Sequence, residues 1–148
     1  MTHIAIHLVV TDPAEAAAWY AEALGARETK RITLPGGRTL TVDLLLGDTL
    51  LAVAGEMPER GMRAPVALGG TCAALHVPVP DVDAAWDRAV EAGAVVFEPV
   101  HDAFWGERTG QVLDPFGHRW ALDERVRDVP HEEVVARAGE LFGGSVTA

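Results

Sequence analysis

Residues 5–26 read AIHLVVTDPAEAAAWYAEALGA, and residues 74–94 read ALHVPVPDVDAAWDRAVEAGA. The two stretches are versions of one pattern separated by nearly half of the chain. Each alternates apolar and other residues, reaches an aspartate (Asp12 or Asp81), and continues as an alanine-rich run that ends at a glycine. Alternation predicts a strand, aspartate is a favoured helix N-cap, and glycine commonly follows a helix. The repeat therefore predicts two strand-helix units.

More strand-like runs follow each unit. The first is followed by RETKRITLP and GGRTLTVDLLLGDTLLAVAGE, and the second by AVVFEPV, GQVLD and HRWALD. Glycine pairs and the Asp114-Pro115-Phe116-Gly117 sequence separate these runs as turns. Each half is therefore predicted to be β-α-β-β-β. This order indicates an α+β fold of paired modules.

Length and composition indicate one domain. The chain has 148 residues, of which 49% are hydrophobic, and a chain of this size buries enough surface for a single core. We expect one domain over residues 1–127, with modules at about 1–56 and 71–125 and a Pro- and Gly-rich linker at 57–70. Residues 128–148 are predicted to form an accessory helix and tail, with Asp128 as its cap and Pro130 in its first turn.

Charge and apolar runs narrow the classes of partner. The formal net charge is −10, which disfavours nucleic acid. No apolar run is long enough to cross a membrane, and the first residues lack the basic start of a signal peptide. We therefore expect a soluble cytoplasmic protein whose partner is a small molecule. The single cysteine, Cys72, is expected to be a small buried residue.

The paired modules and the segment FWGERTGQVLDPFGHRW at 104–120 resemble the vicinal oxygen chelate superfamily over residues 3–125. That superfamily includes glyoxalase I, extradiol dioxygenases, fosfomycin resistance enzymes and bleomycin-binding proteins. The resemblance implies that the curved mixed sheets of the two modules surround a cavity. It also implies a homodimer, and in many members a cavity built from modules of both chains. It does not specify an activity, because one scaffold carries several chemistries in this superfamily.

The resemblance also implies where a divalent metal would be held, by His and Glu or Gln side chains. The matching positions in this chain are Ala5, Ala52, Ala74 and Ala121. Methyl groups cannot coordinate a metal, which needs N, O or S donors. We therefore expect no cofactor, and a divalent metal only through a non-standard site.

Alternation predicts which side chains replace these ligands, because residues two apart in a strand share a face. The predicted cavity face contains six polar residues: His7, Thr41, Asp43, His76, Arg119 and Asp123. Three roles stay open for the two histidines: hydrogen-bonding or acid-base contact with a ligand, a shifted metal site with a carboxylate, or a structural role. Asp43 and Arg119 are expected either to pair with each other or to bind charged groups of a ligand.

Aromatic residues of the 104–120 segment complete the prediction. The resemblance implies that Phe104 and Trp105 lie at the cavity mouth, where flat rings can stack on a ligand. Trp120 is expected in the core, Phe116 at the end of the sheet, and Glu107 and Arg108 as a solvated pair.

Three classes of function remain. The first is a metal-free protein that binds or sequesters a small aromatic or cationic molecule, as bleomycin-binding proteins do in antibiotic resistance. The alternative is an enzyme of lyase, isomerase or dioxygenase type that uses His7 and His76 directly or through a shifted metal site. The third is a structural or regulatory dimer.

Overall fold

The first half of the chain folds into a four-stranded sheet with one covering helix. The computed structural model describes residues 2–143. The elements are β1 (Ile6–Val10), α1 (Pro13–Leu24), β2 (Arg27–Thr33), β3 (Thr39–Leu46) and β4 (Thr49–Gly55). The strand order is β1-β4-β3-β2, with β1 and β4 parallel and the other neighbours antiparallel. We refer to this as the first sheet.

The second half repeats this arrangement. Its elements are β5 (Ala74–Pro78), α3 (Val82–Glu91), β6 (Val95–Asp102), β7 (Glu107–Leu113) and β8 (Arg119–Arg125). The second sheet has the order β5-β8-β7-β6, again with one parallel pair, β5 and β8. The predicted pair of β-α-β-β-β modules is confirmed.

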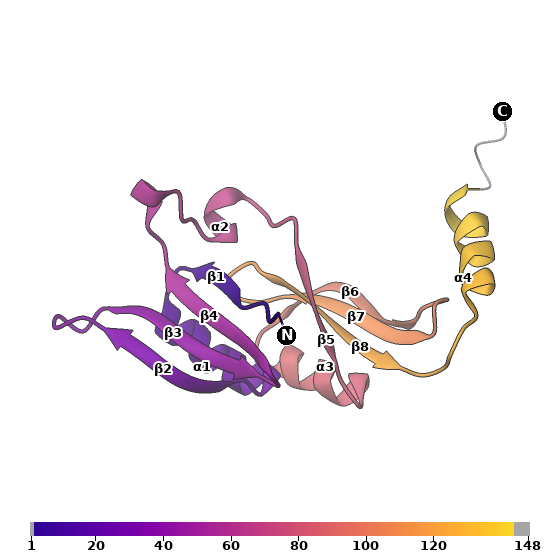
Figure 1. Cartoon of the computed structure of the whole chain (residues 1–148), viewed down its shortest axis with the longest axis horizontal. Coiled ribbons are helices and arrows are strands. Elements are labelled where there is room, and N and C mark those ends of the chain that lie inside the picture. Colours follow the sequence, from indigo (N-terminus) through magenta and orange to yellow (C-terminus); the bar gives the residue numbers. More distant parts are fainter. Residues whose placement is uncertain (1, 144–148) are drawn as a thin grey trace.

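Short helices connect and extend the modules. The connecting segment contains a 3₁₀ turn η1 (Pro58–Arg60) and a single helical turn α2 (Pro65–Leu68). After β8 comes α4 (His131–Ala138), which stands away from the sheets in Figure 1 and continues into a π-helical turn η2 (Gly139–Gly143). Of the expected C-terminal tail, residues 144–148 lie outside the described residues. Within residues 2–143, no helix is long and apolar enough to span a bilayer.

Aspartates cap the two sheet-covering helices, as predicted. Asp12 Oδ1 accepts hydrogen bonds from the backbone N–H groups of Ala14 and Glu15 at 3.0 and 3.1 Å. Asp81 Oδ1 accepts from Ala84 N at 3.1 Å. Such bonds satisfy donors that have no partner inside the helix.

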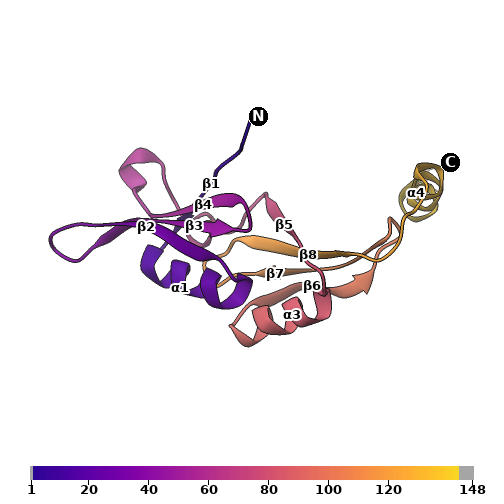
Figure 2. The same cartoon turned by 60° about the horizontal axis from the view of Figure 1, so that its bottom comes forward.

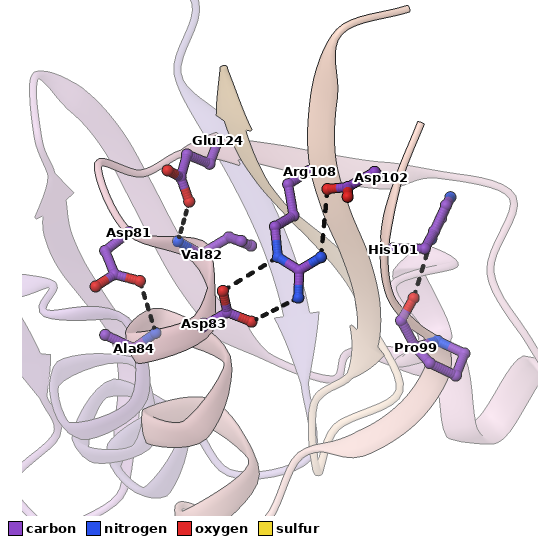
Figure 3. A network of polar contacts seen from close by, with 9 residues as sticks. All are labelled: Asp81, Val82, Asp83, Ala84, Pro99, His101, Asp102, Arg108 and Glu124. Carbon is purple, nitrogen blue, oxygen red and sulfur yellow. Dashed lines mark hydrogen bonds and ion pairs between the residues drawn. The ribbon is translucent and has the colours of Figure 1, made fainter. Parts of the chain in front are cut away.

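Three local predictions are wrong. Asp128 does not cap α4, because its carboxylate pairs with Arg125 and the N-cap is Pro130. Cys72 is exposed, since it precedes β5 rather than packing inside the sheet. Arg108 does not pair with Glu107; Figure 3 shows it reaching Asp83 and Asp102 instead. Adjacent strand residues point to opposite faces, so Arg108 lies on the side of α3 and Glu107 on the other side.

Both modules share one hydrophobic core. The face of each sheet that packs on its helix contributes buried residues: Leu8, Val10, Val42, Leu44, Leu51, Val53, Val112, Trp120 and Leu122. Figures 1 and 2 show α1 and α3 on the same side of the molecule as each other, with the sheets end to end. Trp120 is 2% exposed, so its predicted core position is confirmed. Phe116, expected at the end of the sheet, is 3% exposed and belongs to the same core.

A buried carboxylate joins the modules at the turn between β7 and β8. Asp114 is 3% exposed. Its Oδ2 accepts from the Tyr20 hydroxyl of α1 at 2.5 Å and from Trp120 Nε1 at 2.9 Å. Its Oδ1 accepts from the backbone N–H groups of Phe116 and His118 at 2.8 and 3.0 Å. One side chain therefore fixes the turn and ties it to the other module.

Further polar contacts between the modules surround this carboxylate. Trp19 Nε1 donates to the carbonyl of Ala92 at 2.7 Å, and Arg88 Nε donates to that of Glu22 at 2.6 Å. These bonds align α1 against α3. His118 Nε2 lies 2.9 Å from the carbonyl oxygen of Val9, which links β8 to β1.

Replacing Tyr20 with Phe tests the link between modules. Loss of a donor to a buried carboxylate is expected to lower the free energy of unfolding by about 1–3 kcal/mol. Thr33→Val, which removes an exposed hydroxyl contact, is the control and should change it by no more than about 0.5 kcal/mol. Chemical denaturation measures both, and a Tyr20→Phe protein as stable as the parent would contradict the role given to this bond.

The difference in stability between the parent protein and Tyr20→Phe should depend on pH. Burial, and next the charge of Asp114, raise the pKa of Tyr20 above its ordinary value of 10.0. Above pH 10 the unfolded chain loses this proton while the folded chain keeps it, so stability falls as pH rises. The parent should therefore lose about 1.4 kcal/mol per pH unit relative to Tyr20→Phe in this range.

Candidate functional site

The candidate site consists of the two sheet faces that the helices leave uncovered, which we call the open faces. On the first sheet, His7 pairs with Ala52, Ala52 with Asp43, and Asp43 with Lys30. Leu51 and Val53, on either side of Ala52 in β4, are buried against the helix, so the row that contains Ala52 lies on the open face. A histidine, a methyl group, a carboxylate and an ammonium group therefore follow one another across four strands. Thr41 lies in the next row, paired with Ala54.

The second sheet carries a matching row. His76 pairs with Ala121, Ala121 with Gln111, and Gln111 with Glu98. Trp120 and Leu122, on either side of Ala121, belong to the core, which places Ala121 on the open face. The predicted faces of Ala52 and Ala121 are thus the observed ones. Ala74 begins β5, and Ala5 immediately precedes β1.

A histidine-carboxylate pair stands out on the second open face. His76 Nδ1 lies 2.6 Å from Asp123 Oδ2, and Asp123 Oδ1 accepts from the Thr109 hydroxyl at 2.5 Å. The His76 side chain is 58% exposed, while Asp123 and Thr109 are buried. A buried carboxylate therefore holds one ring nitrogen and leaves the other toward the open face.

Sequence reasoning placed His76 and Asp123 on one face but missed their contact and missed Thr109. The sequence does contain the information needed to place Thr109, because the Asp114-Pro115-Phe116-Gly117 turn sets the antiparallel register of β7 against β8. That register pairs Thr109 with Asp123. Counting outward from the turn would have found the pair.

This arrangement can perform proton transfer. When Asp123 accepts the hydrogen of Nδ1, the neutral imidazole has its lone pair on Nε2 and acts as a base there. The carboxylate would also stabilise the imidazolium that forms. His7 has no such carboxylate partner among residues 2–143, so the pseudo-symmetric histidines differ in chemistry.

The expected ion pair between Asp43 and Arg119 is absent from the described part of the chain. Asp43 lies inside the first sheet and Arg119 begins β8 in the second. The sheets join through their helices and the Asp114 turn, so their open faces do not close on each other within one chain (Figures 1 and 2). Arg119 instead places its guanidinium carbon 4.9 Å from the centre of the Phe97 ring.

The two predicted aromatic contacts lie in the turn between β6 and β7. The rings of Phe104 and Trp105 meet edge to face at 5.0 Å. Trp105 is 43% exposed and donates from Nε1 to Glu107 Oε2 at 2.7 Å. Glu107 shares its face with Thr109, so Trp105 lies at the end of the second open face. Phe104 borders a separate hollow beneath α4.

No metal site is assembled within residues 2–143. In this range no three His, Cys, Asp or Glu side chains gather closely enough to hold an ion. His7 and His76 therefore do not converge on a carboxylate inside one chain, as the shifted metal site would require. Their predicted contact with a ligand stays a prediction.

Comparison with known proteins agrees with this geometry. The sequence model described as Glyoxalase/Bleomycin resistance protein/Dioxygenase superfamily matches residues 1–122. An uncharacterized protein of Mycobacterium bovis is 38% identical over 133 residues, covering 88% of this chain and 88% of that protein. The crystal structure of TioX from Micromonospora sp. ML1 aligns with a TM-score of 0.68 at 30% identity, over 85% of this chain and 100% of that one.

A more distant solved structure shares the fold alone. The genomically encoded fosfomycin resistance protein FosX from Listeria monocytogenes aligns with a TM-score of 0.65 at 15% identity. The alignment covers 90% of this chain and 97% of that one.

The hydrogen bond from His76 to Asp123 is testable without a ligand. We expect neutral His76 to carry its proton on Nδ1, because Asp123 accepts it there, and Asp123→Asn to remove this preference. Nitrogen-15 NMR of the imidazole ring distinguishes the two tautomers, with His7 as the internal control. An unchanged His76 spectrum in the variant would contradict the pairing.

Proposed function

Because this chain belongs to the glyoxalase, bleomycin resistance protein and dioxygenase superfamily, we propose that it binds a small aromatic or cationic molecule on its open faces without a resident metal ion. The observation that carries this proposal is the pair of rows in which Ala52 and Ala121 each lie beside a histidine. Hydrogen-bonding groups are present, but the positions where the resemblance implies metal ligands hold methyl groups. The donor set does not fit the family's divalent ion.

The side chains beside these alanines suit a polar or charged ligand. His7 and Asp43 flank Ala52, and His76 and Gln111 flank Ala121. The Asp43 carboxylate in the first row favours a cationic group of the ligand. The net charge of −10 creates a negative potential that also attracts cations. Trp105 at the end of the second face offers a ring for stacking.

A homodimer is part of the proposal, because apolar side chains remain exposed along both open faces. Ile32 and Leu50 of the first sheet are 43% and 37% exposed, and Val95 and Phe97 of the second are 60% and 53% exposed. Packing the first sheet of one copy over the second sheet of another would bury them and enclose a cavity. Exposed apolar patches of this kind commonly mark interfaces.

A cytoplasmic role in sequestering an antibiotic belongs to the same proposal. It is supported by the fold, which this chain shares with a fosfomycin resistance protein. The ligand-binding proposal does not depend on that role.

Ligand titration tests the proposal. Aromatic antibiotics and aromatic amines should quench tryptophan fluorescence equally well with and without EDTA. Trp105→Ala should weaken the binding of a quenching compound by about 1–3 kcal/mol, as expected for a stacking aromatic. Phe142→Ala, which removes an exposed ring from η2, is the matched control. Quenching abolished by EDTA, or equal affinities in both variants, would contradict the proposal.

The contact between His76 and Asp123 supports a second candidate, an enzyme that transfers a proton. His76 Nε2 would take a proton from carbon next to a carbonyl group, while Asp123 stabilises the resulting imidazolium. Carbonyl compounds incubated in D₂O should then exchange that hydrogen, as seen by proton NMR. His76→Gln should abolish the exchange and His7→Gln should retain it; equal behaviour of the two variants would exclude this candidate.

A further inference from the structure

The second open face holds two buried polar atoms that lack hydrogen-bond partners. Among the side-chain nitrogen and oxygen atoms of residues 2–143, only Gln111 Oε1 and Arg119 Nε are in this state. Gln111 pairs with Ala121, two residues beyond Arg119 on β8, so the two side chains are diagonal neighbours about 7–8 Å apart. Unpaired buried polar atoms are rare because each costs about 1–3 kcal/mol. Both atoms belong to the second open face, and of the two residues only Arg119 lines the hollow described next.

Arg119 borders a hollow of about 340 Å³. The hollow lies between the second sheet and the segment that carries α2, and its other lining is mostly apolar: Pro65, Val66, Gly69, Gly70, Thr71, Phe97, Leu113 and Gly117. Its volume is within the range of small-molecule sites. One cationic side chain among apolar walls is an arrangement that orients a ligand by a single charged group.

The wall formed by α2 is held closely against the turn between β7 and β8. A Cβ atom added to Gly117 would lie 2.9 Å from Pro65 Cβ and 3.3 Å from Val66 N. Glycine at this position, with φ of 90°, therefore permits the contact. The packing of α2 on this turn therefore forms one side of the hollow.

The charge of Arg119 is not neutralised within the described residues. Its guanidinium makes no ion pair or hydrogen bond there, in contrast to Arg108, which reaches two carboxylates. Stacking on Phe97 at 4.9 Å covers one face of the guanidinium plane. The in-plane N–H groups remain the directions in which a planar anion binds.

We propose that this hollow binds the carboxylate of a small aromatic acid through Arg119. The inference rests on the proposed function and narrows its ligand class to aromatic molecules that carry a carboxylate. The two oxygens accept in-plane hydrogen bonds from the guanidinium, and the ring packs against Phe97, Leu113 and Val66. The Gln111 amide lies on the side of His76, where a further polar group of the ligand would meet it.

An NMR titration of the full chain tests the inference. The probes are 2-naphthoate and its neutral analogue 2-naphthamide, at equal ionic strength. We expect the acid to bind about ten-fold or more tightly than the amide, as a charge-assisted hydrogen bond predicts. Backbone shift changes should centre on Thr71, Leu113 and Arg119.

Arg119→Met keeps an unbranched apolar stem but removes the guanidinium and its charge, and it should abolish the preference for the acid. Arg63→Met is the matched control, because Arg63 is exposed and lies outside the hollow, and it should retain the preference. A preference that survives Arg119→Met, or shift changes away from the hollow, would overturn the inference.

Two further outcomes separate this inference from the function on which it rests. If the amide binds in the hollow as tightly as the acid, anion recognition is excluded while aromatic binding stands. If neither probe nor any aromatic antibiotic or amine binds on the open faces, the proposed function itself fails. A third outcome would assign the Arg119 guanidinium to Asp43 of a second copy instead of a ligand. In that case Arg119→Met and Asp43→Asn would each dissociate a dimer in sedimentation experiments, and the inference would be overturned.

Discussion

The carboxylate of Asp114 is the contact on which the arrangement of the molecule depends. It accepts hydrogen bonds from Tyr20 in one module and from Trp120 and two backbone N–H groups in the other. A buried carboxylate with fewer donors would be costly. The turn, the helix α1 and the start of β8 must therefore keep this geometry together, and the shared core follows from it.

This way of joining the modules determines which surfaces are available for function. Because α1 and α3 pack on each other through contacts such as Trp19 to Ala92, each sheet has one face in the core and one face open. The open faces keep the polar rows, and they also keep exposed apolar side chains such as Phe97 and Val95. A chain folded in this way leaves one face of each sheet uncovered within the described residues.

The two open faces share a pattern but not a chemistry. The first has Asp43 and Lys30 beside its alanine, whereas the second has Gln111 and the carboxylate-supported His76. On the second face His76 lies beside Ala121, while Arg119, which has no ion-pair partner in the described part of the chain, lies two residues earlier on β8. Repetition of the module supplied the scaffold, and substitutions within each copy made the faces different.

Local sequence determined the elements of this protein, and tertiary packing determined their partners. The repeat, the capping aspartates and strand alternation were enough to predict both modules and the faces of Ala121 and Trp120, since these depend on neighbours in the chain. The exposure of Cys72, the contact of Arg119 with Phe97 instead of Asp43, and the separation of the open faces were not predictable in this way. Alternation says which face a side chain occupies, but only long-range packing through the Asp114 turn decides what that face meets.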